Sequence, residues 1–529
     1  MNTTSFTITG GDFDHVGAAA SGLKRKLKKL GVPPDALRRL VIAAYEAEAN
    51  IVVHAREGTL RATLGPSRID VEIDDRGPGI ADVELAMQEG FSTASPAAMA
   101  LGFGAGMGLP NIKRNSNTFA IESEVGEGTR VRFSIDLPPQ KLSVPLGSSV
   151  RMAAEHCRAC MRCLHVCPTG ALRIRRKGPE ILGHLCIDCA ACIGACETGA
   201  LSAPDENEVP PPSERNLLVV PASFLAGFGP EIDAHAILDA LDELGFGEVR
   251  LLGDWERVLR QAALAYARDE AKARPVLSPV CPAVVNLVEM RFPALLGHLA
   301  PFLSPIEAAR EELDQAHAVV GVSCPAQYSV LTGRSSSAPS SDLLPAHLSR
   351  LRDAVLPIAS RRKRTSTPTP APRPASADAQ QSHADVLRAT GTRHVLKVLD
   401  KAEEGLLADF LLVELYACDG GCFGAPAGGE APSIASARWR RVREGFAKPA
   451  KAFRRTAPFR ARSGMRLDEE MARAIEKLAR IDRLTAELPG KNCGMCGAPT
   501  CGDLAEDLVL ERPGTLACPH TTAGPETQP

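Results

Sequence analysis

The residues of this chain best able to do chemistry are its 16 cysteines, spread over 529 residues at regular spacings. In a reducing compartment, a patterned set of thiols indicates metal binding rather than disulfides. Eight cysteines lie within residues 157–196, four lie between residues 281 and 422, and four lie within residues 493–518. This grouping leaves no cysteine over, so the sequence predicts about four sites of four thiolates each.

The first eight cysteines form two copies of one pattern. CRACMRCLHVCPTGAL (157–172) and CIDCAACIGACETGAL (186–201) both follow C-x₂-C-x₂-C-x₃-C. This spacing resembles that of bacterial two-cluster ferredoxins, in which the fourth cysteine of each run binds the other cluster. The resemblance implies one [4Fe–4S] cube on Cys157, Cys160, Cys163 and Cys196, and a second on Cys186, Cys189, Cys192 and Cys167. Glu197 replaces the proline usual in the family but removes no ligand. Zinc is the alternative, because C-x₂-C pairs also bind zinc.

The next four cysteines lie in three separate segments. These are SPVCPAVVN (278–286), GVSCPAQYS (321–329) and ELYACDGGCFGAP (414–426). In this order they resemble the three cysteine segments of the [FeFe]-hydrogenase large subunit. The resemblance implies that Cys281, Cys324, Cys418 and Cys422 hold one [4Fe–4S] cube.

Departures from the hydrogenase pattern lie at the positions that serve the diiron subsite. Val280 replaces a cysteine that carries protons, and Gln327 replaces a lysine that holds a cyanide of the diiron unit. Val322 and Tyr416 replace two methionines. We therefore expect a cube alone, or at most a slow sensory hydrogen site, and no vigorous hydrogen turnover.

The last four cysteines follow C-x₂-C-x₄-C-x₁₆-C within residues 488–520. The segment resembles the small iron–sulfur domain of corrinoid proteins and of ion-pumping ferredoxin oxidoreductases. The resemblance implies a [4Fe–4S] cluster on Cys493, Cys496, Cys501 and Cys518. Zinc is again the alternative, although glycines that offer N–H groups to sulfur favour a cluster.

Four features of the first 140 residues indicate a nucleotide site. Glu46 and Asn50 lie on one face of a helix predicted over residues 33–55. DRGPG (75–79) follows a strand predicted over 69–75, and a glycine-rich loop at 102–114 leads into a helix whose amino end could receive phosphate. GEGT (126–129) lies between two strands predicted over 119–137.

Together these features resemble the GHKL ATP-binding fold, in particular the anti-sigma-factor serine kinases. The resemblance implies that Asn50 helps to hold Mg²⁺, that Glu46 positions or deprotonates the attacking group, and that Asp75 contacts the adenine amine. It further implies a set of pocket and lid residues: Gly77 and Gly79 at the pocket, Gly104, Gly106 and Gly108 in the lid, and Thr129 near the base. A domain that binds ATP without turnover, or binds nothing, is the alternative. No dimerisation helix with a phosphoacceptor histidine is found.

The predicted fold class is a multidomain α/β and α+β chain. The expected domains are a GHKL α/β sandwich (1–140), a ferredoxin-like dicluster domain (148–205), a hydrogenase-like α/β domain (215–445) and a small iron–sulfur domain (465–525). Residues 361–382 are basic and then rich in Pro, Ser, Thr and Ala, so a flexible insertion is expected at about 334–385.

The bulk composition excludes several classes of partner and location. A formal net charge of -2 gives no electrostatic reason to expect direct nucleic-acid binding. No stretch approaches the roughly 18 uncharged apolar residues of a membrane span, and the amino end does not resemble a secretory signal. We therefore expect a cytoplasmic protein.

These features predict a redox- or hydrogen-responsive regulator. Its ATP-binding domain would relay the state of the clusters to a protein partner, such as an anti-anti-sigma-like regulator, and an electron donor or acceptor would serve the clusters. An ATP-dependent serine/threonine kinase activity is one form of this relay, which the sequence leaves open. The alternatives are an iron–sulfur oxidoreductase and a non-enzymatic scaffold switched by ATP.

Overall fold

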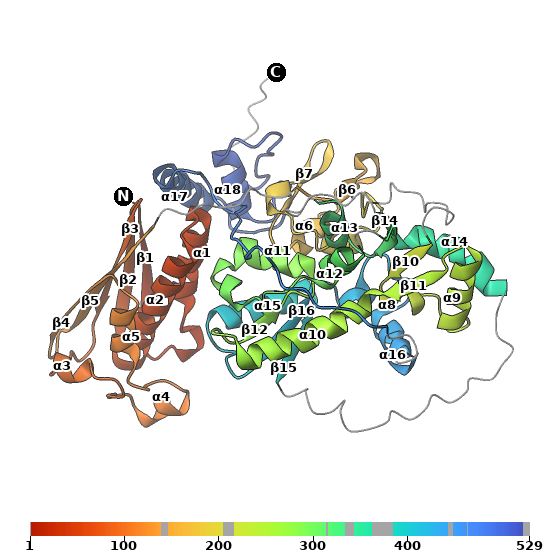
Figure 1. Cartoon of the computed structure of the whole chain (residues 1–529). Helices are drawn as coiled ribbons and strands as arrows, with labels where there is room; N and C mark the ends of the chain where they lie inside the picture. The colour runs from red at the N-terminus through yellow and green to blue at the C-terminus, as the bar shows by residue number, and fades with distance from the viewer. Residues whose placement is uncertain are drawn as a thin grey trace, which may run out of the picture.

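The computed structural model describes residues 2–138, 147–204, 216–313, 316–333, 343–361, 385–442, 448–462 and 464–521. We refer to an N-terminal module (2–138), a cysteine-rich module (147–204), a central module (216–462) and a C-terminal module (464–521). All four mix helices with strands or turns, which confirms the predicted multidomain α/β class (Figure 1). No helix of the described residues is long and apolar enough to cross a membrane.

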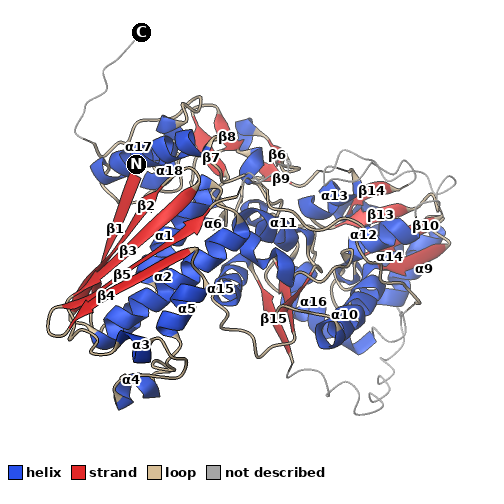
Figure 2. Ribbon diagram, turned by 60° about the vertical axis from the view of Figure 1, so that its left-hand side comes forward, coloured by secondary structure: helices blue, strands red, loops and turns tan. Residues whose placement is uncertain are grey.

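The N-terminal module is one antiparallel sheet with helices against one face (Figure 2). Its strands have the order β1-β2-β3-β5-β4 in the sheet. Their bounds are β1 (Asn2–Thr9), β2 (Glu57–Leu64), β3 (Arg68–Asp75), β4 (Thr118–Glu124) and β5 (Gly128–Asp136). The helices are α1 (Ala18–Leu30), α2 (Pro34–His54), α3 (Val83–Ala86), α4 (Pro96–Ala100) and α5 (Gly108–Arg114). The helix and the three strands expected from the sequence are all present.

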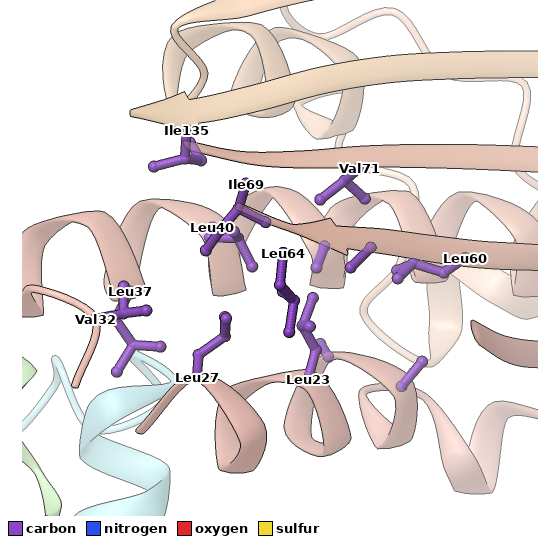
Figure 3. Close-up of a cluster of buried hydrophobic side chains, with 14 of the residues drawn as sticks. Leu23, Leu27, Val32, Leu37, Leu40, Leu60, Leu64, Ile69, Val71 and Ile135 are labelled. Atoms are coloured by element: carbon purple, nitrogen blue, oxygen red, sulfur yellow. The ribbon is translucent and has the colours of Figure 1, made fainter. Parts of the chain in front are cut away.

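The core of this module lies between the sheet and the two long helices. Alternate residues of β2 and β3 are buried, because one face of the sheet meets the helices and the other does not. Leu23 and Leu27 of α1 point toward Leu64 of β2, and Leu40 of α2 lies near Ile69 of β3 (Figure 3). This packing holds α2, which carries Glu46 and Asn50, at a fixed position over the sheet.

The cysteine-rich module repeats one backbone conformation. Its elements are β6 (Arg151–Met152), α6 (Arg162–Val166), β7 (Leu172–Arg175), β8 (Gly178–Ile181), α7 (Ala191–Gly194) and β9 (Leu201–Ser202). Ala159 and Met161 of the first cysteine run have φ values of 50° and 62°, and the equivalent Asp188 and Ala190 have 56° and 64°. Left-handed backbone is costly for residues other than glycine, so its recurrence at equivalent positions marks the duplicated sequence as a duplicated structure.

The central module contains two parallel sheets. One has the order β11-β10-β13-β14 and the other β12-β16-β15. The strands are β10 (Leu217–Val220), β11 (Glu248–Leu251), β12 (Val276–Ser278), β13 (Val319–Val322), β14 (Leu344–His347), β15 (Val386–Thr390) and β16 (Leu412–Tyr416). The helices are α8 (Ala222–Leu225), α9 (Ala234–Glu243), α10 (Leu252–Asp269), α11 (Pro282–Arg291), α12 (Pro305–Glu312), α13 (Pro325–Leu331), α14 (Leu348–Arg361), α15 (Thr392–Glu403) and α16 (Pro432–Val442).

One expectation about this module is wrong in part. Residues 343–361 fall inside the stretch expected to be a flexible insertion, but they form β14 and α14. β14 pairs with β13, and α14 buries Leu348, Leu351 and Val355 in the core of the module. The apolar residues of α14 recur at helical spacing, which explains why this part of the expected insertion is buried in the core. The low-complexity stretch at 362–384, and residues 334–342, lie outside the described residues.

The C-terminal module packs directly on the N-terminal module, although they are the two ends of the chain (Figure 1). It consists of α17 (Met471–Glu487), α18 (Cys501–Val509) and the cysteine loops around α18. Ile475, Leu478 and Ile481 of α17 join the same hydrophobic core as Leu23 and Leu27 of α1. The sequence analysis treated these two regions as separate units and did not predict this contact.

Candidate nucleotide pocket and cysteine sites

The N-terminal module has a cavity of about 700 Å³ between α2, the end of β3 and the glycine-rich loop. A space of this size suits a small-molecule ligand. Eight of the predicted nucleotide-site residues line it: Glu46, Asn50, Asp75, Gly79, Gly104, Gly106, Gly108 and Thr129. Gly77 does not line the cavity. Its backbone N–H instead contacts the side chain of Asp75, which does.

Two backbone groups fix the carboxylate of Asp75. The N–H groups of Gly77 and Thr129 donate to Asp75 Oδ1 at 2.9 Å and 3.2 Å. Burial raises the pKa of Asp75, and these two hydrogen bonds oppose that rise. Gly79 follows with a φ of 71°, and a Cβ there would lie 2.1 Å from the carbonyl oxygen of Glu124. Only glycine fits this turn, so the DRGPG segment holds one carboxylate at the wall of the cavity.

The α2 side chains contact the glycine-rich segment from the opposite wall. Asn111 Nδ2 of α5 donates to Glu46 Oε1 at 2.7 Å. A Cβ at Gly108 would lie 2.8 Å from Asn50 Oδ1, so the backbone of the segment passes directly over Asn50. The pocket therefore presents one amide and one oriented carboxylate side by side on α2. The helix whose amino end was expected to receive phosphate is α5, which has only seven residues.

Sequence reasoning missed two residues that orient this site. Asn111 lies in the quoted glycine-rich segment, but only the fold brings it to Glu46. Ser123 of β4 accepts a hydrogen bond from the N–H of Ile80 at 2.8 Å, and its hydroxyl lies 2.9 Å from that of Thr129. Ser123 has no motif around it, so no sequence signal could have identified it.

The structure brings the eight cysteines of the cysteine-rich module together in two groups. Burial, together with the nearby thiolates of Cys160, Cys157 and Cys196, raises the pKa of Cys163 to about 11. The structure thus places Cys196 of the second run with the first three cysteines. Glu197, which replaces the usual proline, forms an exposed ion pair with Arg162 of the first run.

The second set shows the reciprocal crossing. Cys167, Cys186, Cys189 and Cys192 line one small internal cavity. The N–H of Ala171 donates to Cys167 Sγ at 3.2 Å, and the N–H of Asp188 donates to Cys186 Sγ at 3.4 Å. Such N–H···S contacts stabilise negative charge on thiolates bound to iron.

The central module gathers its four cysteines at the carboxyl ends of parallel strands. Cys281 follows β12, Cys324 follows β13, and Cys418 follows β16. Cys281 and Cys324 each precede a helix with proline at its first position, where a missing N–H costs nothing. With Cys422 they line one cavity of about 30 Å³. Parallel strands commonly present ligands at this edge, so the two sheets converge on one thiol site.

Three of the four residues that depart from the hydrogenase pattern line the same cavity, and the fourth, Val322, is buried in β13. Val280, Gln327 and Tyr416 all border it and are buried. Gln327 Oε1 accepts hydrogen bonds from the N–H and hydroxyl of Ser323, both at 2.9 Å. The amide therefore serves the fold of its own segment. Glu256 of α10, which the sequence analysis did not identify, also borders the cavity.

The C-terminal module brings its cysteines together around the start of α18. Burial raises the pKa of Cys496, and the thiolates of Cys518 and Cys493 act in the same direction. Asn492 Oδ1 accepts the N–H of Cys501 at 2.9 Å, which fixes the first residue of α18 next to the loop that carries Cys493. Four thiols are the donor set of a [4Fe–4S] cluster and also of a structural zinc site.

Comparison with known families gives four matches in chain order. Residues 11–135 match the histidine kinase-like ATPase domain, and residues 156–201 match the 4Fe-4S dicluster domain. Residues 219–316 match the C-terminal domain of the iron only hydrogenase large subunit, and residues 488–520 match a putative Fe-S cluster domain. The hydrogenase match includes Cys281 but ends before Cys324. An anti-sigma- and serine-kinase-like ATPase domain is thus fused to iron–sulfur and hydrogenase-like domains.

Individual relatives resemble the N-terminal module. The serine/threonine-protein kinase RsbT of Bacillus subtilis is 32% identical over 136 residues, which are 25% of this chain and 96% of RsbT. An anti-sigma F factor of Caldanaerobacter subterraneus subsp. tengcongensis is 36% identical over 97 residues, which are 17% of this chain and 64% of that protein.

Among solved structures, an apo [FeFe]-hydrogenase from Chlamydomonas reinhardtii is 14% identical with a TM-score of 0.31, covering 46% of this chain and 88% of that one.

Replacing Asn50 tests the nucleotide pocket. We expect Asn50→Ala to weaken Mg²⁺–ATP binding by roughly 100-fold, because the resemblance to the GHKL fold assigns the side-chain oxygen of Asn50 to the cation. Iron content should stay unchanged, since the cysteine sites lie in other modules. Calorimetric titration and iron analysis check both results. Asn117→Ala is the matched control, because Asn117 bonds Arg39 and the N–H of Asp136. If Asn50→Ala also lost iron, this would contradict the expectation that the nucleotide pocket and the cysteine sites are independent of each other.

Replacing Cys281 tests the central thiol site. Cys281→Ala should lose roughly a quarter of the bound iron, one cube of four, because a cube needs its four thiolates. The ferredoxin-type electron paramagnetic resonance signals should remain. Val280→Ala trims the adjacent side chain in the same cavity and should keep all the iron. Full retention of iron by Cys281→Ala would show that the site is assigned incorrectly.

Proposed function

Because this chain belongs, through its N-terminal module, to the histidine kinase-like ATPase family that includes RsbT, we propose that it is a regulatory protein kinase. Its iron–sulfur sites report the availability of low-potential electrons, and the ATPase domain passes this state to a protein partner. The observation that carries the proposal is the shared hydrophobic core of the N-terminal and C-terminal modules. A cluster-binding module packed against the ATPase domain supports a coupling between the two.

The nucleotide pocket supports phosphate transfer. In the proposed complex, Asn50 holds Mg²⁺ on the phosphates and Asp75 receives the adenine amine, with Gly77, Gly79 and Thr129 around it. Gly104, Gly106 and Gly108 close over the phosphates. Glu46, oriented by Asn111, takes the proton of a serine or threonine hydroxyl on the partner. The hydroxyl oxygen then bonds to the γ-phosphorus and ADP leaves with the electron pair of the broken bond.

The partner is proposed by analogy with the named relatives. RsbT is named as a serine/threonine-protein kinase, and the anti-sigma F factors by the factor they oppose. A small regulator of the anti-anti-sigma type, with a phosphorylatable hydroxyl, is the class of partner that fits. We place the ATPase domain at residues 1–140, the dicluster domain at 148–205, the hydrogenase-like domain at 215–445 and the last iron–sulfur domain at 465–525.

The central site is proposed to hold a [4Fe–4S] cube without a diiron subsite. Cys281, Cys324, Cys418 and Cys422 supply the cube ligands. Val280 offers no proton carrier, and Gln327 is already bonded to Ser323. The proposed role of this cube is to store one electron. Four such cubes, one at each thiol site, would use all 16 cysteines.

Redox-dependent phosphorylation is the test of the proposed function. Anaerobic protein should transfer ³²P from γ-labelled ATP to a serine or threonine of a protein from the source cells, at different rates in its reduced and oxidised states. Glu46→Gln should lower the rate by roughly 100-fold or more in both states, because it removes the base. Nucleotide binding without transfer in either state would instead favour a scaffold switched by ATP.

An infrared spectrum distinguishes the oxidoreductase alternative. Protein co-produced with hydrogenase maturation enzymes should show cluster iron but no stretches of metal-bound carbonyl or cyanide, because Val280 and Gln327 replace the groups that would serve a diiron unit. An active [FeFe]-hydrogenase prepared alongside is the positive control. Carbonyl and cyanide bands in this protein would favour a hydrogen sensor or slow hydrogenase.

A further inference from the structure

One short helix of the C-terminal module, α18, contacts three functional regions at once. Its first residue, Cys501, is a predicted cluster ligand. Glu506 forms an ion pair with Lys29 of α1 in the N-terminal module at 2.8 Å. The next residue, Asp507, forms a fully buried ion pair with Arg173 of the cysteine-rich module, through bonds of 2.6 Å and 2.9 Å. Any change in the position of α18 therefore acts on both neighbouring modules.

The C-terminal thiol site also lies against the dicluster site. The loop between Cys493 and Cys496 passes next to α6: a Cβ at Gly494 would lie 3.4 Å from His165 Nε2. His165 lies two residues after Cys163, a ligand of the first dicluster set. In addition, the N–H of Ile174 donates to the carbonyl oxygen of Gly497 at 2.8 Å. These backbone contacts place two thiol sites on directly adjoining segments, which suits electron exchange between them.

Hydrogen bonds connect α1, in turn, to α2, the helix that carries Glu46 and Asn50 of the nucleotide pocket. Glu48 of α2 is buried, and its two carboxylate oxygens accept the N–H groups of Ala19 and Ala20 at 3.1 Å and 3.0 Å. A carboxylate at the amino end of a helix is stabilised by the unpaired N–H groups and the helix dipole. Glu48 lies between Glu46 and Asn50 in α2, so α1 is hydrogen-bonded to the same stretch of α2 that carries the pocket residues.

We propose that α18 couples the C-terminal thiolate site to the nucleotide pocket, and that the Lys29–Glu506 ion pair is the contact that transmits the coupling. The inference rests on the proposed function, since it names how the pocket is regulated. A reduced low-potential one-electron carrier of the ferredoxin class is oxidised by one electron, and the cysteine-bound iron gains that electron. One negative charge is thereby added at the amino end of α18. That charge changes the electrostatic energy of the helix that carries Glu506.

Other ion pairs join the modules but lack a direct link to a thiol site. Lys26 of α1 pairs with Asp482 of α17 at 2.7 Å, and Lys24 and Lys28 pair with Glu403 of α15. Neither α17 nor α15 contains a cysteine. The Lys26–Asp482 pair is thus a matched control: it joins α1 to the same module with the same chemistry and nearly the same distance.

The test measures how the redox state changes nucleotide affinity in the full-length, iron-loaded protein. The Kd of a non-hydrolysable ATP analogue with Mg²⁺ is determined by titration after reduction with dithionite and after mild oxidation with thionine. In the unmodified protein the two values should differ by about fivefold or more, as expected for coupled sites. In Lys29→Met and Glu506→Gln the ratio should fall to near one. Lys26→Met should keep the ratio of the unmodified protein.

The outcomes separate this inference from the proposed function. A redox-dependent affinity that survives in both Lys29→Met and Glu506→Gln overturns the inference and leaves the proposed function in place. An unmodified protein with the same affinity in both states overturns both. A ratio lost equally in Lys26→Met would show that general docking, rather than α18, matters. Iron content and melting temperature confirm that the variants are folded, and the Lys29→Met/Glu506→Gln double variant should match either single variant.

Discussion

The carboxylate of Asp507 is the group on which the arrangement of the modules depends. It accepts hydrogen bonds from Arg173, Arg175 and Arg512, and both Asp507 and Arg173 are fully buried. Although burial opposes ionisation, these guanidinium groups hold the pKa of Asp507 below its usual value. A buried charge left without its partner is costly, so neither side of this contact separates easily. The pair fixes α18 on the cysteine-rich module, and the adjacent Glu506 fixes the same helix on α1.

The sites on either side of this contact differ in their physical character. The N-terminal module has a cavity of about 700 Å³, and hydrogen bonds orient its carboxylates: one from Asn111 to Glu46, and two from backbone N–H groups to Asp75. Most cysteines of the thiol sites are partly exposed, although burial still raises the pKa of thiols such as Cys192 and Cys324 to about 12. Such thiols would have to lose their protons to bind a metal, so metal binding would be linked to the folding of these modules.

The central module holds its cysteines and the residues that depart from the hydrogenase pattern in different ways. Cys281, Cys324 and Cys418 follow strands of the parallel sheets, so the sheets themselves fix their positions. The departing residues are built into the fold beside them: Val280 packs in the core, and Gln327 of α13 accepts hydrogen bonds from Ser323.

The sequence by itself determined the local elements and the grouping of the cysteines. The periodicity of residues 33–55 predicted α2, and the spacing of the thiols predicted the four sets, because helix faces and ligand spacing depend on near neighbours in the chain. The tertiary structure alone decided the rest: that Asn111 reaches Glu46, that residues 343–361 are ordered, and that α18 meets α1. Lys29 and Glu506 are paired only because both helices bury apolar faces in one core, and no pattern in the sequence records such a long-range contact.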